Sequence, residues 1–351
     1  MKVTLQTVAD AVGVSRSTVS NAYSRPDQLS PELRQRIMET AARLGYAGPD
    51  PTARSLRRGR AGAIGVLFTD TMSTAFADPY AVRFLRGLSE VAQLQRTSVL
   101  LVPLPVDDPA AAVDAVRDAA VDGFCVYCVP DWHHVMEVIE SRGLPAVTNE
   151  QGASGAMFVG IDEAAAAEAA GAHLIALGHR RIAVIANWFT PDRSTRIVPV
   201  PDPAEVPYYV SRERLRGYHR AWVAAGLDWA DVTVVNAEAN ERAVGAQCAA
   251  LVLDRAPRPT AIVTFADVQA LGVLDAITDR GLRPGRDVSV IGFDDIPEAA
   301  TAGLTTIRQP AAERGRRAGQ LLLEPPADPA ARHVVLPTEL IVRASTGPEG
   351  S

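Results

Sequence analysis

Short, continuously apolar runs alternate with longer helical patterns over most of the chain, from residue 63 onward. The run at 63–68 precedes a helical pattern at about 79–95, and this order repeats until a last long run at 288–293. Continuous apolar strands separated by helices are typical of parallel sheets that helices cover on both faces. The repeats fall into two series, which predicts an α/β body of two doubly wound parallel sheets.

The first 46 residues lack this alternation and have the pattern of three short helices. Apolar residues recur at helical spacing within 5–12, and Gly13 then interrupts the pattern where a turn with positive φ is favoured. Ser15 and Ser30 are suited to cap the second and third helices, and Gly45 to end the third. Three helices with a Gly-containing turn between the first two are typical of a head that places its second helix in the major groove of DNA.

Positive charge is concentrated in the same segment. The whole chain carries −6, but residues 1–60 hold ten Lys and Arg against five Asp and Glu and so carry +5, which leaves −11 on the remainder. A positive head on an acidic body fits a protein that meets phosphates at one end. No apolar run reaches 18 residues, and the chain opens on an amphipathic helix instead of a secretion leader, so we expect a cytoplasmic protein with no membrane contact.

Motifs in the head, in the segment after it and in the body occur together. They are Val3-Thr4-Leu5, Gly13-Val14-Ser15 and Thr18-Val19-Ser20, then Gly45-Tyr46 with Ala53-Arg54-Ser55-Leu56-Arg57-Arg58-Gly59, and finally 172–183, 282–295 and 304–310. Together they resemble the lac repressor (LacI) family of bacterial transcription factors. The resemblance implies a helix-turn-helix head, a hinge helix, and a two-lobed core like that of periplasmic binding proteins, with a small-molecule effector between the lobes.

The resemblance also implies domain boundaries. We expect a DNA-binding domain at 1–46, a hinge helix and linker at 47–60, an effector-binding and dimerisation core at 61–346, and a tail at 347–351. The family's core crosses between the lobes three times, and we place these crossings near 160, 292 and 320. The N-lobe then comprises about 61–160 and 292–320, and the C-lobe about 161–291 and 321–346, with paired strands at 333–336 and 339–343. The tail carries no leucine heptad, which favours a homodimer over a tetramer.

The exposed positions of the second helix, predicted at 16–23, are candidates for DNA contact. Arg16, Ser17 and Asn21 are predicted to read base edges, because arginine bonds guanine and asparagine bonds adenine in the major groove. Hydroxyl groups suited to phosphate contacts, which set register, belong to Thr4, Ser15, Thr18 and Ser20. By resemblance, Ala53 and Leu56 of the hinge helix enter the minor groove, where an apolar side chain can kink the duplex.

Polar residues at the carboxyl ends of the predicted strands are candidates for effector contact, because parallel sheets leave a crevice there. Tyr80 can stack on a sugar or base ring, and the resemblance assigns effector binding to Arg214 and Asp294. The full candidate set is Asp78, Tyr80, Glu150, Asp162, Arg214, Asp267 and Asp294. Carboxylates and a guanidinium group that converge on a cleft suit a polyhydroxylated ligand.

Two departures from the family pattern concern this cleft. Ala266 stands where members usually have Asn, and no aromatic residue stands near Ala239 and Asn240, where members tend to have one. The segment 187–211 is longer than usual and holds five prolines with the aromatic residues Trp188, Phe189, Tyr208 and Tyr209. We hypothesise that this segment forms a lid over the cleft and replaces the missing aromatic residue.

These features predict a sequence-specific transcriptional repressor. It would bind a palindromic operator in double-stranded DNA as a homodimer and respond to a carbohydrate effector; a purine or nucleoside co-repressor stays open. A sugar-binding uptake protein would share the core but not the basic head. An oxidoreductase is disfavoured because no G-x-G-x-x-G follows the first strand. No catalytic triad or metal-ligand spacing occurs, and Cys125 and Cys128 alternate on a strand, so we expect no enzymatic activity, cofactor or metal.

Overall fold

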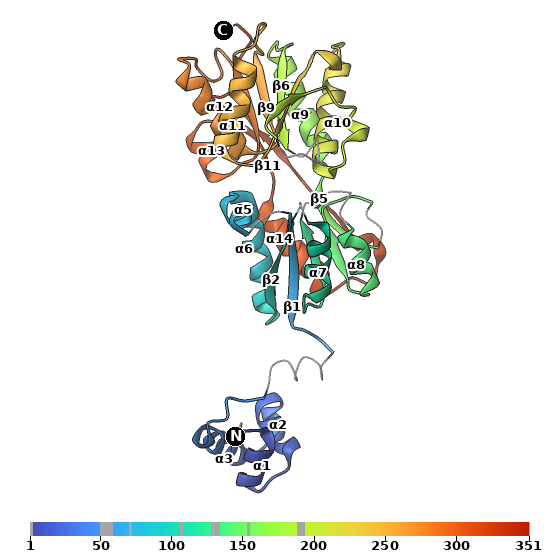
Figure 1. The fold of residues 1–351 in the computed structure, drawn as a ribbon, viewed down its shortest axis with the longest axis vertical. Coiled ribbons are helices and arrows are strands. Elements are labelled where there is room, and N and C mark those ends of the chain that lie inside the picture. The colour runs from blue at the N-terminus through green and yellow to red at the C-terminus, as the bar shows by residue number, and fades with distance from the viewer. Residues whose placement is uncertain are drawn as a thin grey trace. The chain divides into compact units, whose positions relative to one another are not determined.

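A computed structural model describes residues 3–49, 59–69, 72–105, 108–127, 129, 134–152, 155–187 and 194–350. The chain forms two compact units, a head at 1–62 and a core at 63–351 (Figure 1). The predicted hinge helix, with Ala53 and Leu56, falls at 50–58 and so lies outside the described residues.

The head contains the three predicted helices, α1 (Leu5–Val12), α2 (Arg16–Ser24) and α3 (Pro31–Leu44). The predicted caps are confirmed. The Ser15 hydroxyl accepts a hydrogen bond from the Thr18 backbone N–H at 3.0 Å, and Gly13 has a φ of 75° where α1 ends. Val8, Val19 and Ile37 from the three helices are fully buried together, so one small apolar core holds the head.

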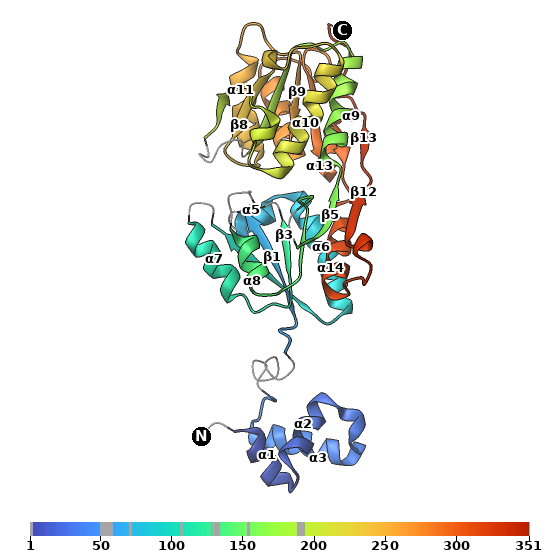
Figure 2. The same cartoon turned by 90° about the vertical axis from the view of Figure 1, so that its right-hand side faces the viewer.

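The N-lobe of the core is built on an all-parallel sheet of six strands in the order β12-β5-β4-β3-β1-β2. Its strands are β1 (Ala63–Thr69), β2 (Ser98–Leu104), β3 (Phe124–Tyr127), β4 (Ala146–Thr148), β5 (Met157–Ile161) and β12 (His333–Leu336). Its helices are α5 (Met72–Ala77), α6 (Pro79–Leu94), α7 (Pro109–Asp118), α8 (Val135–Ser141) and α14 (Ala311–Leu323). Alternate side chains of β1 face opposite ways: Val66 packs with α6 and α14, and Leu67 with α7 and α8. Figure 2 shows these helices on the two sides of the sheet.

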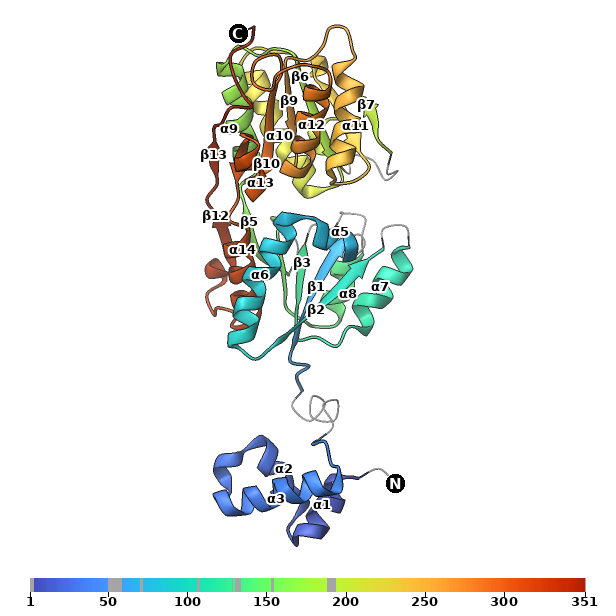
Figure 3. The same cartoon turned by 90° about the vertical axis from the view of Figure 1, so that its left-hand side faces the viewer.

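The C-lobe is built on a seven-stranded sheet in the order β13-β11-β10-β9-β6-β8-β7. Its strands are β6 (Ile182–Asn187), β7 (Arg196–Val198), β8 (Thr233–Ala237), β9 (Ala261–Thr264), β10 (Ser289–Asp294), β11 (Thr305–Arg308) and β13 (Glu339–Ile341). Its helices are α9 (Glu163–Ala176), α10 (Tyr209–Ala224), α11 (Arg242–Leu253), α12 (Asp267–Asp279) and α13 (Pro297–Thr301). The first two cover one face and the other three cover the opposite face (Figure 3). The strands pair in parallel except at the edges, where β7 and β13 are antiparallel.

The chain passes between the lobes at three places, two of which differ from the prediction. The first crossing lies between β5 and α9, close to the expected residue 160. The second follows β11 at Arg308, because β10 and β11 are neighbours in the C-lobe sheet, so the expectation near 292 is wrong. The third lies at 337–338 instead of near 320, since α14 and β12 both belong to the N-lobe.

The strands at 333–336 and 339–341 are not a pair, contrary to the prediction. β12 pairs with β5 in the N-lobe, and β13 pairs with β11 in the C-lobe. Two strands separated by two residues have the local pattern of a hairpin. Here each strand extends a different sheet, and the sequence pattern of a strand does not identify its partner.

The predicted tail is attached to the C-lobe. The buried His179 ring contacts the Gly347 carbonyl oxygen through Nε2 at 3.0 Å, and Glu349 pairs with Arg181 at 3.2 Å. The Glu349 backbone N–H also donates to the Leu177 carbonyl at 2.9 Å. The last described residues therefore belong to the folded core.

Candidate ligand cavity and nucleic-acid interface

A cavity of about 160 Å³ lies between the two lobes of the core. The carboxyl ends of β1 and β3 meet it from the N-lobe, and those of β6, β9 and β10 from the C-lobe, as expected for parallel strands. This volume is close to the ~150 Å³ of an engineered cavity that holds benzene, so it fits one ring-sized molecule. Its described polar lining comprises Thr69, Asp78, Tyr80, Tyr127, Glu163, Asn187, Tyr208, Ser211, Arg214, Asn240, Asp294, Gln309 and Arg314.

A buried ion pair forms part of the C-lobe side of the cavity. Arg214 on α10 donates through Nε to Glu163 at the start of α9 at 2.8 Å. The same guanidinium group donates to the Phe265 carbonyl and lies over the Phe293 ring, 3.6 Å from its centroid. Desolvation of two buried charges is unfavourable, so such a pair is weak evidence for stability and better evidence for a site.

Asp294 enters the cavity from the end of β10 in a sparsely populated backbone conformation. Its φ is 125°, and its carboxylate accepts a hydrogen bond from Gln309 Nε2 at 2.6 Å. Burial, with the added charge of Asp267, raises the pKa of Asp294 well above its usual value. Left-handed backbone at a non-glycine residue and a perturbed buried acid both cluster at binding sites.

The N-lobe side of the cavity is formed around Tyr80 at the start of α6. The Asp78 carboxylate caps this helix by accepting from the Tyr80 backbone N–H at 2.9 Å, and burial raises the pKa of Asp78. Arg314 of α14 donates to the Tyr80 hydroxyl at 2.9 Å and to the Val159 carbonyl at 3.2 Å. Burial also raises the pKa of Tyr80 to about 12, so the phenol stays protonated.

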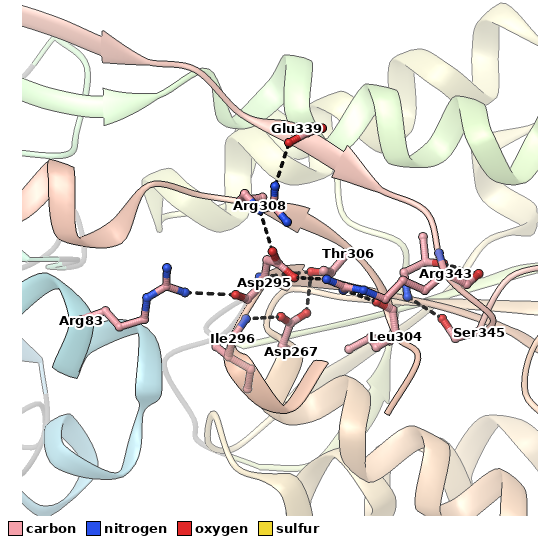
Figure 4. A network of polar contacts seen from close by, with 11 residues as sticks. Arg83, Asp267, Asp295, Ile296, Leu304, Thr306, Arg308, Glu339, Arg343 and Ser345 are labelled. Atoms are coloured by element: carbon pink, nitrogen blue, oxygen red, sulfur yellow. Dashed lines mark hydrogen bonds and ion pairs between the residues drawn. The ribbon is translucent and has the colours of Figure 1, made fainter. Parts of the chain in front are cut away.

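The residue after Asp294 lies at the centre of a polar network that reaches both lobes (Figure 4). The Asp295 carboxylate accepts from Arg308 at 2.7 Å and from Arg343 at 2.6 Å, and its backbone carbonyl accepts from Arg83 of α6 at 3.0 Å. Arg308 also pairs with Glu339 at 3.0 Å. Arg308 directly precedes the second crossing, and Glu339 directly follows the third. The network therefore connects these two crossings and Arg83 of the N-lobe to Asp295, the residue next to the cavity residue Asp294.

The head presents most of the predicted DNA-contact residues on its surface. Arg16 and Ser17 are exposed at the start of α2, and Asn21, half-buried, donates to Gln28 Oε1 at 3.5 Å. The hydroxyl groups of Thr4 and Ser15 are N-caps on exposed residues, and Thr18 is half-buried beside Ser15.

Ser20 is the exception among these candidates, because it is buried. The prediction had placed it on the solvent side of α2, but it is 7% exposed and next to Val19 at the edge of the buried face. A small side chain can be enclosed at that edge without leaving a void, and the helical pattern of apolar residues does not reveal it. Ser20 is therefore removed from the set of phosphate-contact candidates.

Comparison with known proteins identifies the family. The model of bacterial regulatory proteins of the lacI family matches residues 4–48, and that of a periplasmic binding protein-like domain matches 172–346. An HTH-type transcriptional regulator of Mycobacterium tuberculosis is 39% identical over 350 residues, which cover 99% of this chain and 98% of that relative. The chain belongs to the LacI family of bacterial transcriptional regulators.

Solved structures of LacI-family regulators have the same fold. A LacI-family transcriptional regulator from Corynebacterium glutamicum matches with a TM-score of 0.74 and 33% identity, covering 97% of this chain and 98% of that one. The complex of the transcriptional regulator CelR with cellobiose matches with a TM-score of 0.68 and 25% identity, covering 98% and 100%. LacI-family relatives are regulators and not enzymes, which rules out the oxidoreductase and the uptake protein. In the described part of the chain, no helix has the length and hydropathy to cross a bilayer.

Three of the seven effector candidates, which were chosen from the predicted strand ends and the LacI-family resemblance, lie outside the cavity. The Asp267 carboxylate accepts from the Thr306 hydroxyl at 2.6 Å, Asp162 caps α9 on the exposed surface, and Glu150 lies at a separate surface hollow with Arg332. The lining does contain the other four, which are Asp78, Tyr80, Arg214 and Asp294. Asp78 both caps α6 and lines the cavity, whereas Asp162 caps α9 away from it, so a position near a strand end did not by itself show which side chains reach the cavity.

The sequence interpretation missed several polar groups of the LacI-family cavity. Gln309 and Arg314 follow the second crossing and were not expected there, because the crossing itself was misplaced. Gln309 lies in a family-like segment, which was a usable signal, whereas Arg314 shares its helix with two other arginines and has the pattern of a surface charge. Glu163 directly follows the candidate Asp162, and the pattern does not tell which of two neighbouring acids turns inward.

The long segment 187–211 is only partly a cavity element. Residues 196–198 form β7, an edge strand against β8, and the Asn236 side chain donates to the Ser194 carbonyl at 2.9 Å. At its far end, Tyr208 and Ser211 line the cavity, so one aromatic residue of this segment does reach it. Trp188 and Phe189 lie outside the described residues, and the lid hypothesis stays a prediction for them.

Proposed function

We propose that this LacI-family protein is a cytoplasmic, homodimeric repressor of a palindromic operator, controlled by an unphosphorylated carbohydrate of about one ring. The observation that carries the proposal is that charged side chains from both lobes line one ring-sized cavity. A ligand held by both lobes favours one inter-lobe arrangement over others, which is how an effector changes the affinity of a distant head for DNA.

The charges of the cavity support a neutral, polyhydroxylated effector. Its described lining has three carboxyl groups, of Asp78, Glu163 and Asp294, and two guanidinium groups, of Arg214 and Arg314. Both guanidinium groups already bond protein oxygens. A phosphate group would therefore meet more acids than arginines. The cellobiose complex of CelR supports a carbohydrate, and the small cavity volume supports a single ring.

Exposed apolar residues support self-association of the core. Leu94 of α6 is 84% exposed and Leu100 of the edge strand β2 is 40% exposed, on two elements that contact each other. Large exposed apolar side chains on neighbouring elements are typical of interfaces. A two-fold dimer would present two heads to a palindrome, whose half-sites mirror the symmetry of the protein.

The test is binding of the full-length protein to DNA from upstream of its own gene. Fluorescence anisotropy should give a strongly salt-dependent affinity for one palindromic segment. Arg16→Ala should weaken binding to that segment by about 1–3 kcal/mol, whereas Arg43→Ala, on α3, should have a smaller and sequence-independent effect. Equal binding to every fragment would contradict the proposal.

The effector part is tested with the same palindrome. Unphosphorylated pentoses, hexoses and cyclic polyols are added one at a time, together with the corresponding sugar phosphates, purines and nucleosides. We expect one neutral polyol to weaken operator binding and Arg214→Ala to abolish this response. A response only to a phosphate ester or to a purine would overturn the carbohydrate assignment while leaving the DNA part intact.

A further inference from the structure

Gln269 lies in the first turn of α12 and is fully buried, yet it does not line the cavity. Its amide nitrogen Nε2 donates to two places at once, the side-chain oxygen Oδ1 of Asn187 at 3.1 Å and the backbone carbonyl of Ala239 at 3.2 Å. Asn187 ends β6 and Ala239 follows β8, and both residues line the cavity. One buried amide thus holds two cavity-lining segments.

Packing alone does not explain an amide at this position. The other atom of the Gln269 amide, Oε1, is buried with no hydrogen-bond partner among the described residues. An unpaired buried acceptor is unfavourable, and a side chain of the same length without polar atoms would avoid it. Compared with an apolar residue, Gln269 adds two donated hydrogen bonds, one to Asn187 and one to the Ala239 carbonyl.

The backbone that carries Gln269 is firmly held. A Cβ on Gly245 of α11 would overlap the Gln269 carbonyl, so the two helices are in direct backbone contact there. Six residues further along α12, Asp275 accepts from Arg242 of α11 through both carboxylate oxygens, at 2.6 and 2.7 Å. Because the backbone of Gln269 is fixed by these contacts, its side-chain amide can fix the positions of Asn187 and Ala239, to which it donates.

The two hydrogen bonds determine which polar atoms remain for a ligand. The backbone carbonyl of Asn187 accepts from the Ser211 hydroxyl at 2.9 Å, and its side-chain oxygen is taken by Gln269. Only the amide nitrogen Nδ2 of Asn187 has no partner among the described residues, and it can only donate. Next to the Ala239 carbonyl that Gln269 bonds, Asn240 has a buried side-chain oxygen Oδ1 with no hydrogen-bond partner in the described part of the chain, and this oxygen can only accept.

We infer that Gln269 is a positioning residue that sets the hydrogen-bonding polarity of the C-lobe side of the cavity, with Asn187 as donor and Asn240 as acceptor. The inference rests on the proposed effector function and narrows it. A ligand that satisfies both groups offers one acceptor and one donor on the same side, which two neighbouring hydroxyl groups provide. The two asparagines then supply the amide contact that is missing at Ala266.

The test compares Gln269→Met with Val273→Ala. Gln269→Met keeps the length of the side chain and removes both donors. Val273→Ala is the matched control, because Val273 is also fully buried on α12 but belongs to the apolar core of the lobe. Crystal structures of the two variants show whether Asn187 keeps its amide orientation and whether residues 238–240 keep their path, without any ligand being known.

We expect Gln269→Met to turn or disorder the Asn187 amide and to shift residues 238–240, and Val273→Ala to leave both unchanged. If Asn187 and Asn240 stay in place in Gln269→Met, the positioning role is wrong. This outcome is independent of the effector, so it is distinct from a failure of the proposed function, which would show as no response to any polyol of the panel.

Ligand discrimination gives the second measurement. For the polyol of the panel that binds most tightly, monodeoxy derivatives are compared by calorimetry. In the wild type, at least one derivative should bind tenfold or more weakly than the parent; in Gln269→Met that derivative and the parent should bind alike. Val273→Ala should keep the wild-type ratio even if it lowers thermal stability. An unchanged ratio in Gln269→Met would overturn the inference.

Discussion

Asp267 and Asp294 place two carboxyl groups in a nearly dry part of the C-lobe. Asp267 accepts hydrogen bonds from the Thr306 hydroxyl at 2.6 Å and the Ile296 backbone N–H at 2.9 Å, so it supports the chain directly after Asp294. Burial raises the pKa of Asp267 to about 6 and, with the charge of Asp267, that of Asp294 well above its usual value. Asp267 and Asp294 therefore keep their protons in the folded protein at pH values at which the same groups are ionised in the unfolded chain.

This predicts how stability depends on pH. The folded-state pKa of Asp267 lies above its unfolded value of about 4, so the unfolding free energy falls as pH rises from about 4 to about 6, by up to about 1.4 kcal/mol per pH unit. Asp267→Asn removes this contribution and also the repulsion on Asp294. Urea unfolding of both proteins across this window should show the wild type losing stability relative to the variant. Parallel pH profiles would contradict the prediction.

At the scale of elements, the N-lobe depends on the close approach of α6 and α14. A Cβ on Gly87 would overlap the Ala312 carbonyl, and one on Gly315 would overlap the Phe84 carbonyl, so glycine is required on both helices. This contact holds α14, which follows the second crossing, against α6, whose first turn carries Tyr80. The geometry of the cavity on the N-lobe side thus depends on a backbone contact between residues that do not line it themselves.

Gly315→Ala should therefore destabilise the core by about 1–3 kcal/mol through overpacking, despite the better helix propensity of alanine. The matched control is Gly319→Ala in the same helix, where the nearest atoms to the added Cβ are side-chain atoms, of Leu88 at 3.1 Å and of Val91 at 3.3 Å, instead of a backbone carbonyl. We expect the control to change the unfolding free energy by less than about 1 kcal/mol. Chemical denaturation of both variants makes the comparison, and a larger loss in Gly319→Ala would refute the packing argument.

At the scale of the whole core, the lobes are joined by three crossings and by a side-chain contact outside the cavity. Arg83 of α6 donates to the carbonyl of Asp295, which directly follows the cavity residue Asp294. Asp295 has left-handed backbone, with a φ of 54°, and its carboxylate holds Arg308 beside the second crossing. We therefore expect a shift of Asp294 to change the contacts that its neighbour Asp295 makes with the N-lobe and with Arg308 beside the second crossing.

Removal of Arg83 should loosen the inter-lobe arrangement. The lost hydrogen bond is worth about 1 kcal/mol, so populations of inter-lobe states should shift by about fivefold. Spin labels at Ser89→Cys and Ala300→Cys, both exposed, should give a broader distance distribution in Arg83→Ala. Arg86→Ala is the control, because the ion pair that Arg86 makes among the described residues is within α6, with Glu90 at 3.5 Å. Equal distributions in the two variants would show that the contact has no such role.

The features of this protein that were predicted correctly from the sequence are mainly those that depend on residues close together along the chain. The caps Ser15 and Ser30 and the turn at Gly13 depend on atoms three or four residues away, and all are present. The strand–helix alternation depends on burial of each apolar run, and it predicted the two-lobed α/β core. Arg214 and Asp294 were identified through family motifs and do line the cavity.

Tertiary structure alone decided the crossings, the partners of the last two strands and the final membership of the cavity. Each depends on which segments, distant along the chain, meet: β12 with β5, Arg314 with Tyr80, Gln269 with Asn187. The periodicity of apolar residues indicates whether a side chain is buried, but it does not indicate which segment the side chain packs against. The amino-acid sequence by itself thus determined the fold class and the family, whereas long-range packing decided which polar groups face a common ligand.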